Sequence, residues 1–446
     1  MNNGLAARFP PGFVFGASAS DYQIEGAWNE DGKGPGIWDV FCRRPGAVLN
    51  GDTGDVACDH YHRWREDVEL MARLGLRAYR FAISWPRVLP NGLGPINEAG
   101  LDFYDRLVDA LLERGITPYA TLYHWNLPQA LQSRGGWGVR DCVGWFAEYA
   151  ARVADRLADR VTNWITINEP EVVAFLGHAA GIHAPGLRDT GLALRVVHQL
   201  LLAHGLAASA LRAAHSGLEV GLSLNLYDCQ PASDRPEDVE AARRADGYQN
   251  RWYLDPLFGR GYPADMVAWY GTDFPSDHVN EGPALAADLD FLGVNYYSRR
   301  VAAAGPEGLL KVVNRLPADA TRTAMGWEVY PDGLTSVLIR LHRDYGVRSL
   351  LVTENGAAYH DVPNGSEHID DPDRREYLAS HLTASASAIE AGVPLQGYFV
   401  WSLLDNFEWA LGYSQRFGLV YVDYATRQRV MKTSGLWYRD LIAAAR

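Results

Sequence analysis

The stretch YHRWREDVELMARLGLRAYRFAISW, residues 61–85, contains the structural unit that decides the fold. Its apolar side chains keep the three- and four-residue spacing of one helix face: Tyr61, Trp64, Val68, Met71 and Leu74. Gly75 suits the left-handed position just past a helix end. The run from Tyr79 to Trp85 has the composition of a strand. This segment therefore predicts an amphipathic helix, a glycine stop and a strand that follows at once.

The same unit recurs along the chain. A second helix face ends at Gly115, before a strand at Ile116 to Tyr123; its apolar residues are Leu101, Tyr104, Leu107, Val108, Leu111 and Leu112. Three further glycines, Gly217, Gly346 and Gly392, precede the apolar runs Leu218–Leu224, Leu350–Val352 and Leu395–Val400. Strands that alternate with helices predict a parallel sheet of the α/β class.

Counting strand candidates gives eight, a number typical of a (β/α)8 TIM barrel. They are Phe13–Ala17, Tyr79–Trp85, Ile116–Tyr123, Trp164–Ile167, Glu219–Leu224, Phe291–Val294, Leu350–Val352 and Gly397–Trp401. An open doubly wound sheet also fits that count. No shift in composition divides the 446 residues, so we expect one domain over 1–446 with its core at about 9–438. Arg43–Asp59, Asp228–Arg243 and Ala302–Trp327 are expected to be long βα loops.

Composition excludes several classes of function. The formal net charge of −13 argues against nucleic acid or an anionic membrane as a partner, because both need a basic face. Residues 1–11 lack the apolar core of a signal peptide, and no uninterrupted apolar run approaches the ~18 residues of a membrane span. The four cysteines are scattered, which is typical of reduced thiols. We expect a cytoplasmic protein; its oligomeric state stays open.

Polar and aromatic residues gather where the predicted strands stop: His124-Trp125-Asn126, Asn168-Glu169, Asn225, Asn295-Tyr296-Tyr297, Glu354-Asn355 and Trp401. Barrel active sites form at this end of the strands. Turn formation by Asn would explain one or two such positions, but not six. Glu169 and Glu354 each follow an apolar run. Two carboxylates in one cleft are what cleavage of a glycosidic bond requires.

These motifs resemble those of the family 1 glycoside hydrolases, the β-glucosidase group of retaining enzymes, from about Phe9 to Tyr438. The matching motifs are FVFGAS (13–18), YRF (79–81), SWPR (84–87), LYHW (122–125), NEP (168–170), NYY (295–297), TENG (353–356) and DNFEW (405–409). The resemblance implies a retaining β-glucosidase on a (β/α)8 barrel, with no cofactor and no metal.

The resemblance also implies a role for each site residue. Glu169 would be the acid/base and Glu354 the nucleophile, with Arg80 lowering the pKa of Glu354. Arg80 and Asn295 would support the pair, and Tyr297 would hydrogen-bond the nucleophile. The residues that would hold or stack on the sugar are Gln23, His124, Asn168, Trp401, Glu408 and Trp409. Taken alone, Trp401 and His124 also fit plain core positions.

The expected partner is a small unphosphorylated β-glucoside, with β-galactosides and β-fucosides as secondary substrates. Family thioglucosidases replace the acid/base by glutamine, so Glu169 favours O-glycosides. The carboxylate of Glu408 disfavours a phosphorylated sugar. This chain departs from the family pattern at Glu171, where many relatives carry Trp. As a hypothesis, Glu171 disfavours flat aromatic or anionic leaving groups.

Two other classes of protein stay open at this stage. One is a sugar-binding protein without activity, whose usual mark would be loss of Glu169 or Glu354. The other is an aldolase or isomerase, which would need a lysine base or a phosphate site. The chain's lysines, Lys33, Lys311 and Lys432, do not lie at predicted strand ends. The pair His60 and His62 opens a helix and does not have the spacing of a known metal site.

Overall fold

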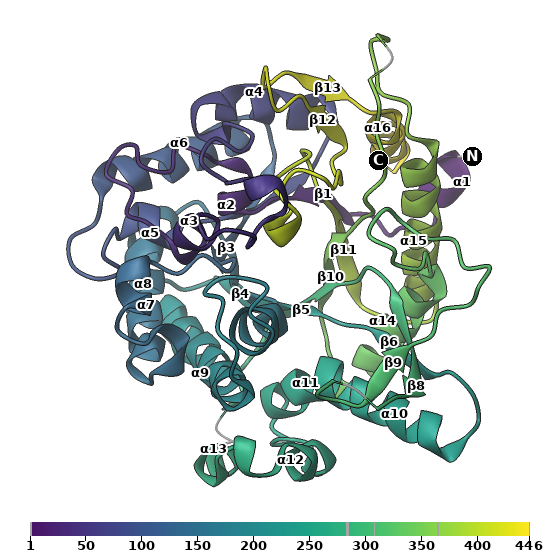
Figure 1. The fold of residues 1–446 in the computed structure, drawn as a ribbon. Coiled ribbons are helices and arrows are strands. Elements are labelled where there is room, and N and C mark those ends of the chain that lie inside the picture. The colour runs from purple at the N-terminus through teal and green to yellow at the C-terminus, as the bar shows by residue number, and fades with distance from the viewer. Residues whose placement is uncertain (1, 282–284, 307, 364, 446) are drawn as a thin grey trace.

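The computed structural model describes residues 2–281, 285–306, 308–363 and 365–445. Its centre is a closed barrel of parallel strands with helices around the outside (Figure 1). The barrel strands are β1 Val14–Ser18, β2 Ala78–Ala82, β3 Thr117–Tyr123, β4 Asn163–Asn168, β5 Glu219–Asn225, β7 Phe291–Asn295, β10 Leu350–Asn355 and β11 Leu395–Trp401.

The strand order is β1-β11-β10-β7-β5-β4-β3-β2. The first and last barrel strands close it in parallel register, from Val14 opposite Gly397 to Ser18 opposite Trp401. A doubly wound sheet would leave two open edges, so the closure decides between the two architectures. The predicted (β/α)8 barrel is confirmed.

Helices of very different length surround the barrel (Figure 1). The longer ones are α4 His60–Arg73, α6 Glu98–Glu113, α8 Asp141–Leu157, α9 Thr190–Ala214, α10 Pro236–Asp246, α14 Pro331–Tyr345, α15 Pro372–Glu390 and α16 Thr433–Ala444. The short α-helices are α1 Asn2–Ala6, α2 Asp21–Ile24, α3 Ile37–Phe41, α5 Trp85–Val88, α7 Gln129–Gln132, α11 Trp252–Leu257, α12 Ala264–Tyr270 and α13 Ser276–Glu281. Short 3-10 helices are η1 Leu49–Gly51, η2 Gly136–Gly138, η5 Gly271–Asp273 and η7 Trp409–Leu411, and π-helices are η3 Val172–Ala179 and η4 Gly247–Arg251.

The glycine stops behave as predicted. Gly75, Gly115 and Gly346 have φ of 67°, 68° and 67°, the left-handed conformation that ends a helix without a Cβ clash. Each therefore turns the chain from an outer helix back into the barrel. This local geometry, repeated around the ring, is what alternates helix and strand.

Two groups of predicted boundaries are wrong. β2 ends at Ala82, because Trp85 and Pro86 open α5, and proline is favoured in a first helical turn. The segments Asp228–Arg243 and Ala302–Trp327 are not plain loops. They contain α10 and a small sheet in the order β6 Asp228–Pro231, β8 Arg299–Ala304 and β9 Val312–Asn314. Its central pairing joins β6 to β8, which are distant in sequence, so no local pattern reveals the sheet.

The barrel interior is apolar near the strand starts and polar near the strand ends. One buried cluster fills the lower part: Ala78, Tyr119, Ile165, Phe291, Leu351 and Phe399. Side chains two positions further along a strand face the same interior. Arg80 and Thr121 take these positions and hydrogen-bond each other at 3.1 Å. The apolar cluster thus supports a polar layer at the mouth of the barrel.

Helix α9 is long and apolar enough, by length and composition, to cross a membrane. In the structure, 67% of its most apolar 18-residue window is buried inside the protein. It packs closely against α8 and η3. Its apolar character is accounted for by this packing.

Candidate active site

Glu169 lies at the carboxyl end of β4, directly after the strand as predicted. Its φ of 46° is unusual for a residue with a side chain, and its backbone N–H donates to the carbonyl of Ser223 at 2.9 Å. Only 4% of the residue is exposed. The turn therefore holds the carboxyl group inside the mouth of the barrel.

Glu354 lies within β10 rather than after it, because the strand continues to Asn355. The pairing of β10 with β7 shifts register between Val352 and Glu354. An irregularity of this kind bends a strand and changes where its side chains point. Glu354 is 3% exposed, so both glutamates are buried at the same end of the barrel.

Two donors bind the carboxylate of Glu354, one to each oxygen. Arg80 Nη1 donates to Oε1 at 2.6 Å, and Tyr297 OH donates to Oε2 at 2.6 Å. Hydrogen bonds to an ionised group are the strong ones. Both donors therefore favour the ionised form of Glu354, as the sequence predicted for these two residues.

A chain of hydrogen bonds connects the two glutamates. Arg80 Nη2 donates to Asn168 Oδ1 at 2.6 Å, and Asn295 Nδ2 donates to that same oxygen at 3.0 Å. Asn295 Nδ2 also donates to Glu169 Oε1 at 2.6 Å. The hydroxyl of Thr353 donates to Asn295 Oδ1 at 2.7 Å, which fixes the amide orientation. One network thus positions both carboxyl groups.

The pKa of Glu354 differs from the sequence expectation. Burial raises it, and Arg80 and the Tyr297 hydroxyl lower it. The expected effect of Arg80 is present, but burial outweighs it, so the pKa of Glu354 lies above its ordinary value. Sequence alone does not reveal how completely water is excluded.

The pKa of Glu169 is raised further, well above its ordinary value. Burial is the largest cause and the negative charge of Glu354 the second, while the amide of Asn295 acts in the opposite direction. Glu169 has no cationic partner within ion-pair distance among the described residues. The pKa of Glu169 is therefore raised more than that of Glu354, as a proton donor beside an ionised nucleophile requires.

A pocket of about 300 Å³ opens above the two carboxyls. The predicted site residues that line it are His124, Glu169, Tyr297, Glu354, Trp401, Glu408 and Trp409. Gln23, Arg80, Asn168 and Asn295 lie behind this wall and are fully or almost fully buried. Arg80 and Asn295 were expected to support the two glutamates, and this position agrees with that. Gln23 and Asn168 were expected to touch the sugar, but they do not line the pocket.

Aromatic side chains form one wall of the pocket. The ring of His124 stacks on Trp401 at 5.7 Å between centroids and on Trp409 at 6.1 Å. Burial, with the charge of Arg80, holds the pKa of His124 well below its ordinary value, so the imidazole is neutral at pH 7. Trp409 also stacks on Tyr22 at 6.3 Å. These rings offer flat apolar surfaces beside polar groups.

Glu408 brings a third carboxyl group to the pocket. Its Oε2 is buried and has no hydrogen-bond partner among the described residues. Burial, together with the charge of Glu354, raises the pKa of Glu408 to about 8, although the Gln23 amide lowers it. Gln23 Nε2 donates to the carbonyl of Phe407 at 2.8 Å. Gln23 thus holds the loop that carries Glu408, whose open oxygen can accept from a ligand hydroxyl.

Sequence reasoning missed most of the outer part of the pocket. Its further lining residues include Asn225, Tyr227, Gln249, Arg300, Met325 and Trp327. They come from segments beyond the strand ends, where no periodicity marks them. Asn225, which ends β5, is the one that the strand-end pattern pointed out. Glu171 also lines this part and is 9% exposed, so it is more buried than an entrance position implies.

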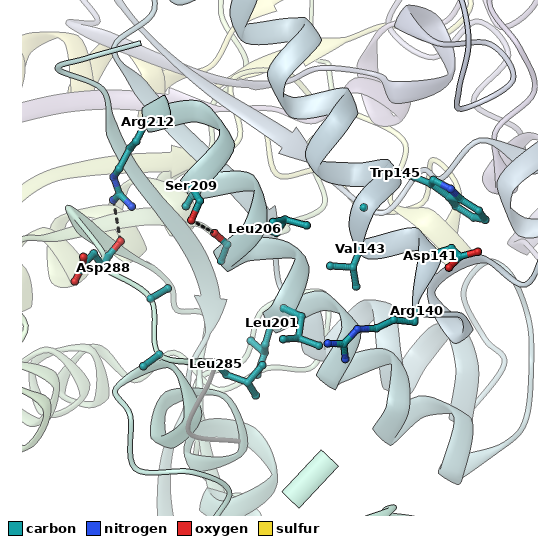
Figure 2. Close-up of a pocket in the computed structure, with 16 residues that line it drawn as sticks. Arg140, Asp141, Val143, Trp145, Leu201, Leu206, Ser209, Arg212, Leu285 and Asp288 are labelled. Atoms are coloured by element: carbon teal, nitrogen blue, oxygen red, sulfur yellow. Dashed lines mark hydrogen bonds between the residues drawn. The ribbon is translucent and has the colours of Figure 1, made fainter. Parts of the chain in front are cut away.

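A larger hollow, of about 790 Å³, lies between α8 and α9 and the segment 285–288 (Figure 2). Its two acidic residues, Asp141 and Asp288, lie at opposite ends. Arg212 donates to the backbone carbonyl of Asp288 at 2.8 Å. Among the described residues that line this hollow, no two titratable side chains pair with each other. The smaller pocket is therefore the better candidate site.

The lysines do not reach the pocket. Lys432 donates to Asp361 and Asp405 at 2.6 Å each, and Lys33 pairs with Asp39 at 2.9 Å. Among the residues that the structure describes, no group of three His, Cys, Asp or Glu side chains is arranged to hold a metal ion. His60 instead bonds Asp67 at 2.7 Å. The chemistry of this site rests on carboxyl groups.

Comparison with known proteins gives one consistent result. The model of the family described as glycosyl hydrolase family 1 matches residues 5–446. Beta-glucosidase A of Thermotoga maritima is 47% identical over 436 residues, covering 98% of each chain. Thermostable beta-glucosidase B of Thermobispora bispora is 50% identical over 443 residues, covering 97% of this chain and 90% of the relative.

The fold agrees with a solved structure as well. The beta-glucosidase from Thermotoga maritima in complex with deoxynojirimycin superposes with a TM-score of 0.96 at 46% identity. The match covers 98% of this chain and 99% of that one. Sequence family, coverage and fold agree along the whole length. The chain belongs to glycosyl hydrolase family 1.

Proposed function

We propose that this protein is a retaining β-glucosidase that releases terminal β-D-glucosyl residues from β-glucosides and short oligosaccharides. The observation that carries the proposal is the pair of buried carboxyls in one hydrogen-bond network with unequal partners. Glu354 accepts hydrogen bonds from Arg80 and Tyr297. Among the described residues, Glu169 accepts a side-chain hydrogen bond from the amide of Asn295 alone. The activity of the named relatives supports the same conclusion.

In the first step, an oxygen of the Glu354 carboxylate attacks the anomeric carbon of the bound glucoside. The bond from that carbon to the leaving oxygen breaks, and Glu169 gives its proton to that oxygen. The products are a glycosyl ester on Glu354 and a free alcohol. Arg80 and Tyr297 favour the ionised form of Glu354 before attack, and the raised pKa of Glu169 favours its protonated form.

In the second step, water cleaves the ester. The negative charge on Glu354 is absent in the ester, so the Coulombic contribution that raised the pKa of Glu169 is lost. Glu169 then ionises more easily, takes a proton from the attacking water and returns to its acid form. Two inversions at one carbon give net retention of the β configuration.

The residues around the pocket favour an unphosphorylated sugar. Glu408 offers a phosphate no positive charge, and its open oxygen suits a hydroxyl donor. β-Galactosides and β-fucosides are proposed as secondary substrates, and short glucans from cellulose degradation as natural ones. Location in the cytoplasm stays a prediction from the sequence. The lysine pairs described above leave an aldolase or isomerase without support.

The test is hydrolysis of a chromogenic β-glucoside by the wild type and by Glu354→Ala. We expect the variant to lose activity by on the order of 10⁴-fold or more. Added azide should restore cleavage and give the α-glycosyl azide, because a small anion replaces the missing carboxylate from the same face. Activity of the variant at the wild-type level without azide would refute the assignment. A wild type that binds glucosides but cleaves none would identify a sugar-binding protein.

A further inference from the structure

The outer part of the pocket carries two opposite charges that do not pair with each other. Glu171 and Arg300 both line it. No nitrogen of Arg300 lies within 4 Å of a carboxylate oxygen anywhere in the described residues, so space remains between the two groups. A pair of opposite charges held apart in a pocket leaves room for a polar ligand group.

Glu171 faces the pocket and has two polar side chains beside its carboxylate. Tyr248 OH donates to Oε1 at 3.3 Å, and η3, which starts at Val172, fixes the backbone that follows. The side chain of Gln249 is a second hydrogen-bonding neighbour, and like Tyr248 it lowers the pKa of Glu171 against the effect of burial. Glu171 therefore presents a charge-bearing acceptor to whatever occupies the outer pocket.

Arg300 presents donors to the same space. It lies on β8, half-buried, with its guanidinium 5.6 Å from the centre of the Tyr227 ring. Its guanidinium makes no hydrogen bond to a described residue, although guanidinium has five donors. Its charge lowers the pKa of Glu171, against the effect of burial. Both side chains line the same pocket, so one ligand can contact both.

Asn225 adds an independent observation. It ends β5 and lines the pocket, and its Oδ1 is buried without a partner among the described residues. An unsatisfied buried acceptor is costly unless a ligand supplies a donor. Trp327 and Met325 provide apolar surface on the pocket wall. Acceptors, donors and an apolar face together match a sugar ring, which has hydroxyls at its edge and C–H groups on its face.

We propose that Glu171 and Arg300 form a leaving-group site that selects a second sugar ring over an aryl or alkyl group. The inference rests on the proposed glucosidase function. Adjacent hydroxyls of the ring donate to Glu171 and accept from Arg300. Because the two charges cancel, the site does not favour an ionic leaving group. A leaving group without hydroxyls would desolvate both charges and return no hydrogen bonds.

The test compares kcat/KM for cellobiose and for cyclohexyl β-D-glucoside. Both release an alcohol that needs a proton from Glu169, and both leaving groups are six-membered rings, so the ratio isolates recognition of hydroxyls. Glu171→Met and Arg300→Met remove one charge each and keep an unbranched side chain. We expect each to lower the cellobiose to cyclohexyl ratio by about tenfold or more.

Matched controls remove the same charges away from the pocket. Glu240→Met on α10 and Arg315→Met just after β9 change exposed residues, and their ratios should equal that of the wild type. An unchanged ratio in both pocket variants would overturn the inference while leaving the glucosidase function intact.

An anionic leaving group is the competing occupant. If Arg300→Met weakens cleavage of 4-carboxyphenyl β-D-glucoside and not of cellobiose, the site binds an anion and the inference is wrong. If the wild type cleaves none of these glucosides, the proposed function itself fails. The three results are distinguishable in one set of assays.

Discussion

The inner and outer parts of the pocket are built in opposite ways. In the inner part, Arg80, Asn168, Asn295 and Glu354 bond to one another at 2.6–3.0 Å. In the outer part, Glu171 and Arg300 share a space without pairing. A closed network fixes reacting groups before substrate arrives, whereas open donors and acceptors are satisfied only by a suitable ligand. The first arrangement serves the chemical step, and the second serves the choice of leaving group.

The largest effect that separates the two parts should come from Glu169→Gln, which removes the proton donor. We expect kcat/KM for cellobiose to fall by about 10²–10⁴-fold. For 2,4-dinitrophenyl β-glucoside the fall should be far smaller, because that leaving group departs without a proton. Steady-state kinetics on the two substrates measures the difference. Equal losses on both would show that Glu169 is not the acid.

A smaller effect within the inner network should come from Tyr297→Phe. This change removes the 2.6 Å hydrogen bond to Glu354. A hydrogen bond to a charged group contributes about 1.5–3 kcal/mol, so kcat/KM should fall about 10–100-fold. Because the hydroxyl lowers the pKa of Glu354, its loss should move the acid limb of the kcat/KM profile to higher pH.

Tyr296→Phe is the matched control for this variant. The hydroxyl of Tyr296 donates to the backbone carbonyl of Tyr330 at 2.7 Å, outside the pocket lining. The acid and basic limbs of its kcat/KM profile should lie at the same pH values as in the wild type. A shift of the same size in both variants would mean that the hydroxyl of Tyr297 has no specific action on Glu354.

Glu408→Gln should affect binding and stability in opposite directions. The change replaces a carboxyl oxygen, an acceptor for ligand hydroxyls, with an amide NH2, which should raise KM for glucosides by about tenfold. The folded-state pKa of about 8 lies above the ordinary value of 4.5, so the folded protein binds this proton more tightly. Wild-type stability is then lost as pH rises from about 4.5 to 8. The Tm advantage of the variant should be greatest at pH 8 and absent below pH 4.5.

The smallest effect should come from Glu171→Trp in the outer part. An indole would offer a stacking surface in place of a charge, so the ratio of kcat/KM for aryl glucosides to that for cellobiose should rise several-fold. The acid limb of the pH profile of kcat/KM, which Glu354 sets, should not move. An unchanged ratio would refute the hypothesis that Glu171 disfavours flat aromatic leaving groups.

The sequence predicted the inner part of the pocket far better than the outer part. Glu169 directly follows the apolar strand β4, and Glu354 lies near the end of the apolar strand β10. An apolar run that stops at a polar residue can be seen in the local sequence. Arg300 lies on β8, which pairs with the distant β6 as well as with the nearby β9, so its place depends on tertiary pairing. The net pKa of Glu354 was missed for a related reason, because it depends on burial by the whole barrel.

The division of roles between the two glutamates can be tested most directly by trapping the intermediate. A 2-deoxy-2-fluoro-β-glucoside with a good leaving group slows the second step and leaves the sugar on the nucleophile. Proteolysis and mass spectrometry then identify the labelled residue. The label is expected on Glu354 at one sugar per chain. A label on Glu169, or turnover of the reagent with no covalent adduct, would contradict the assignment of Glu354 as nucleophile.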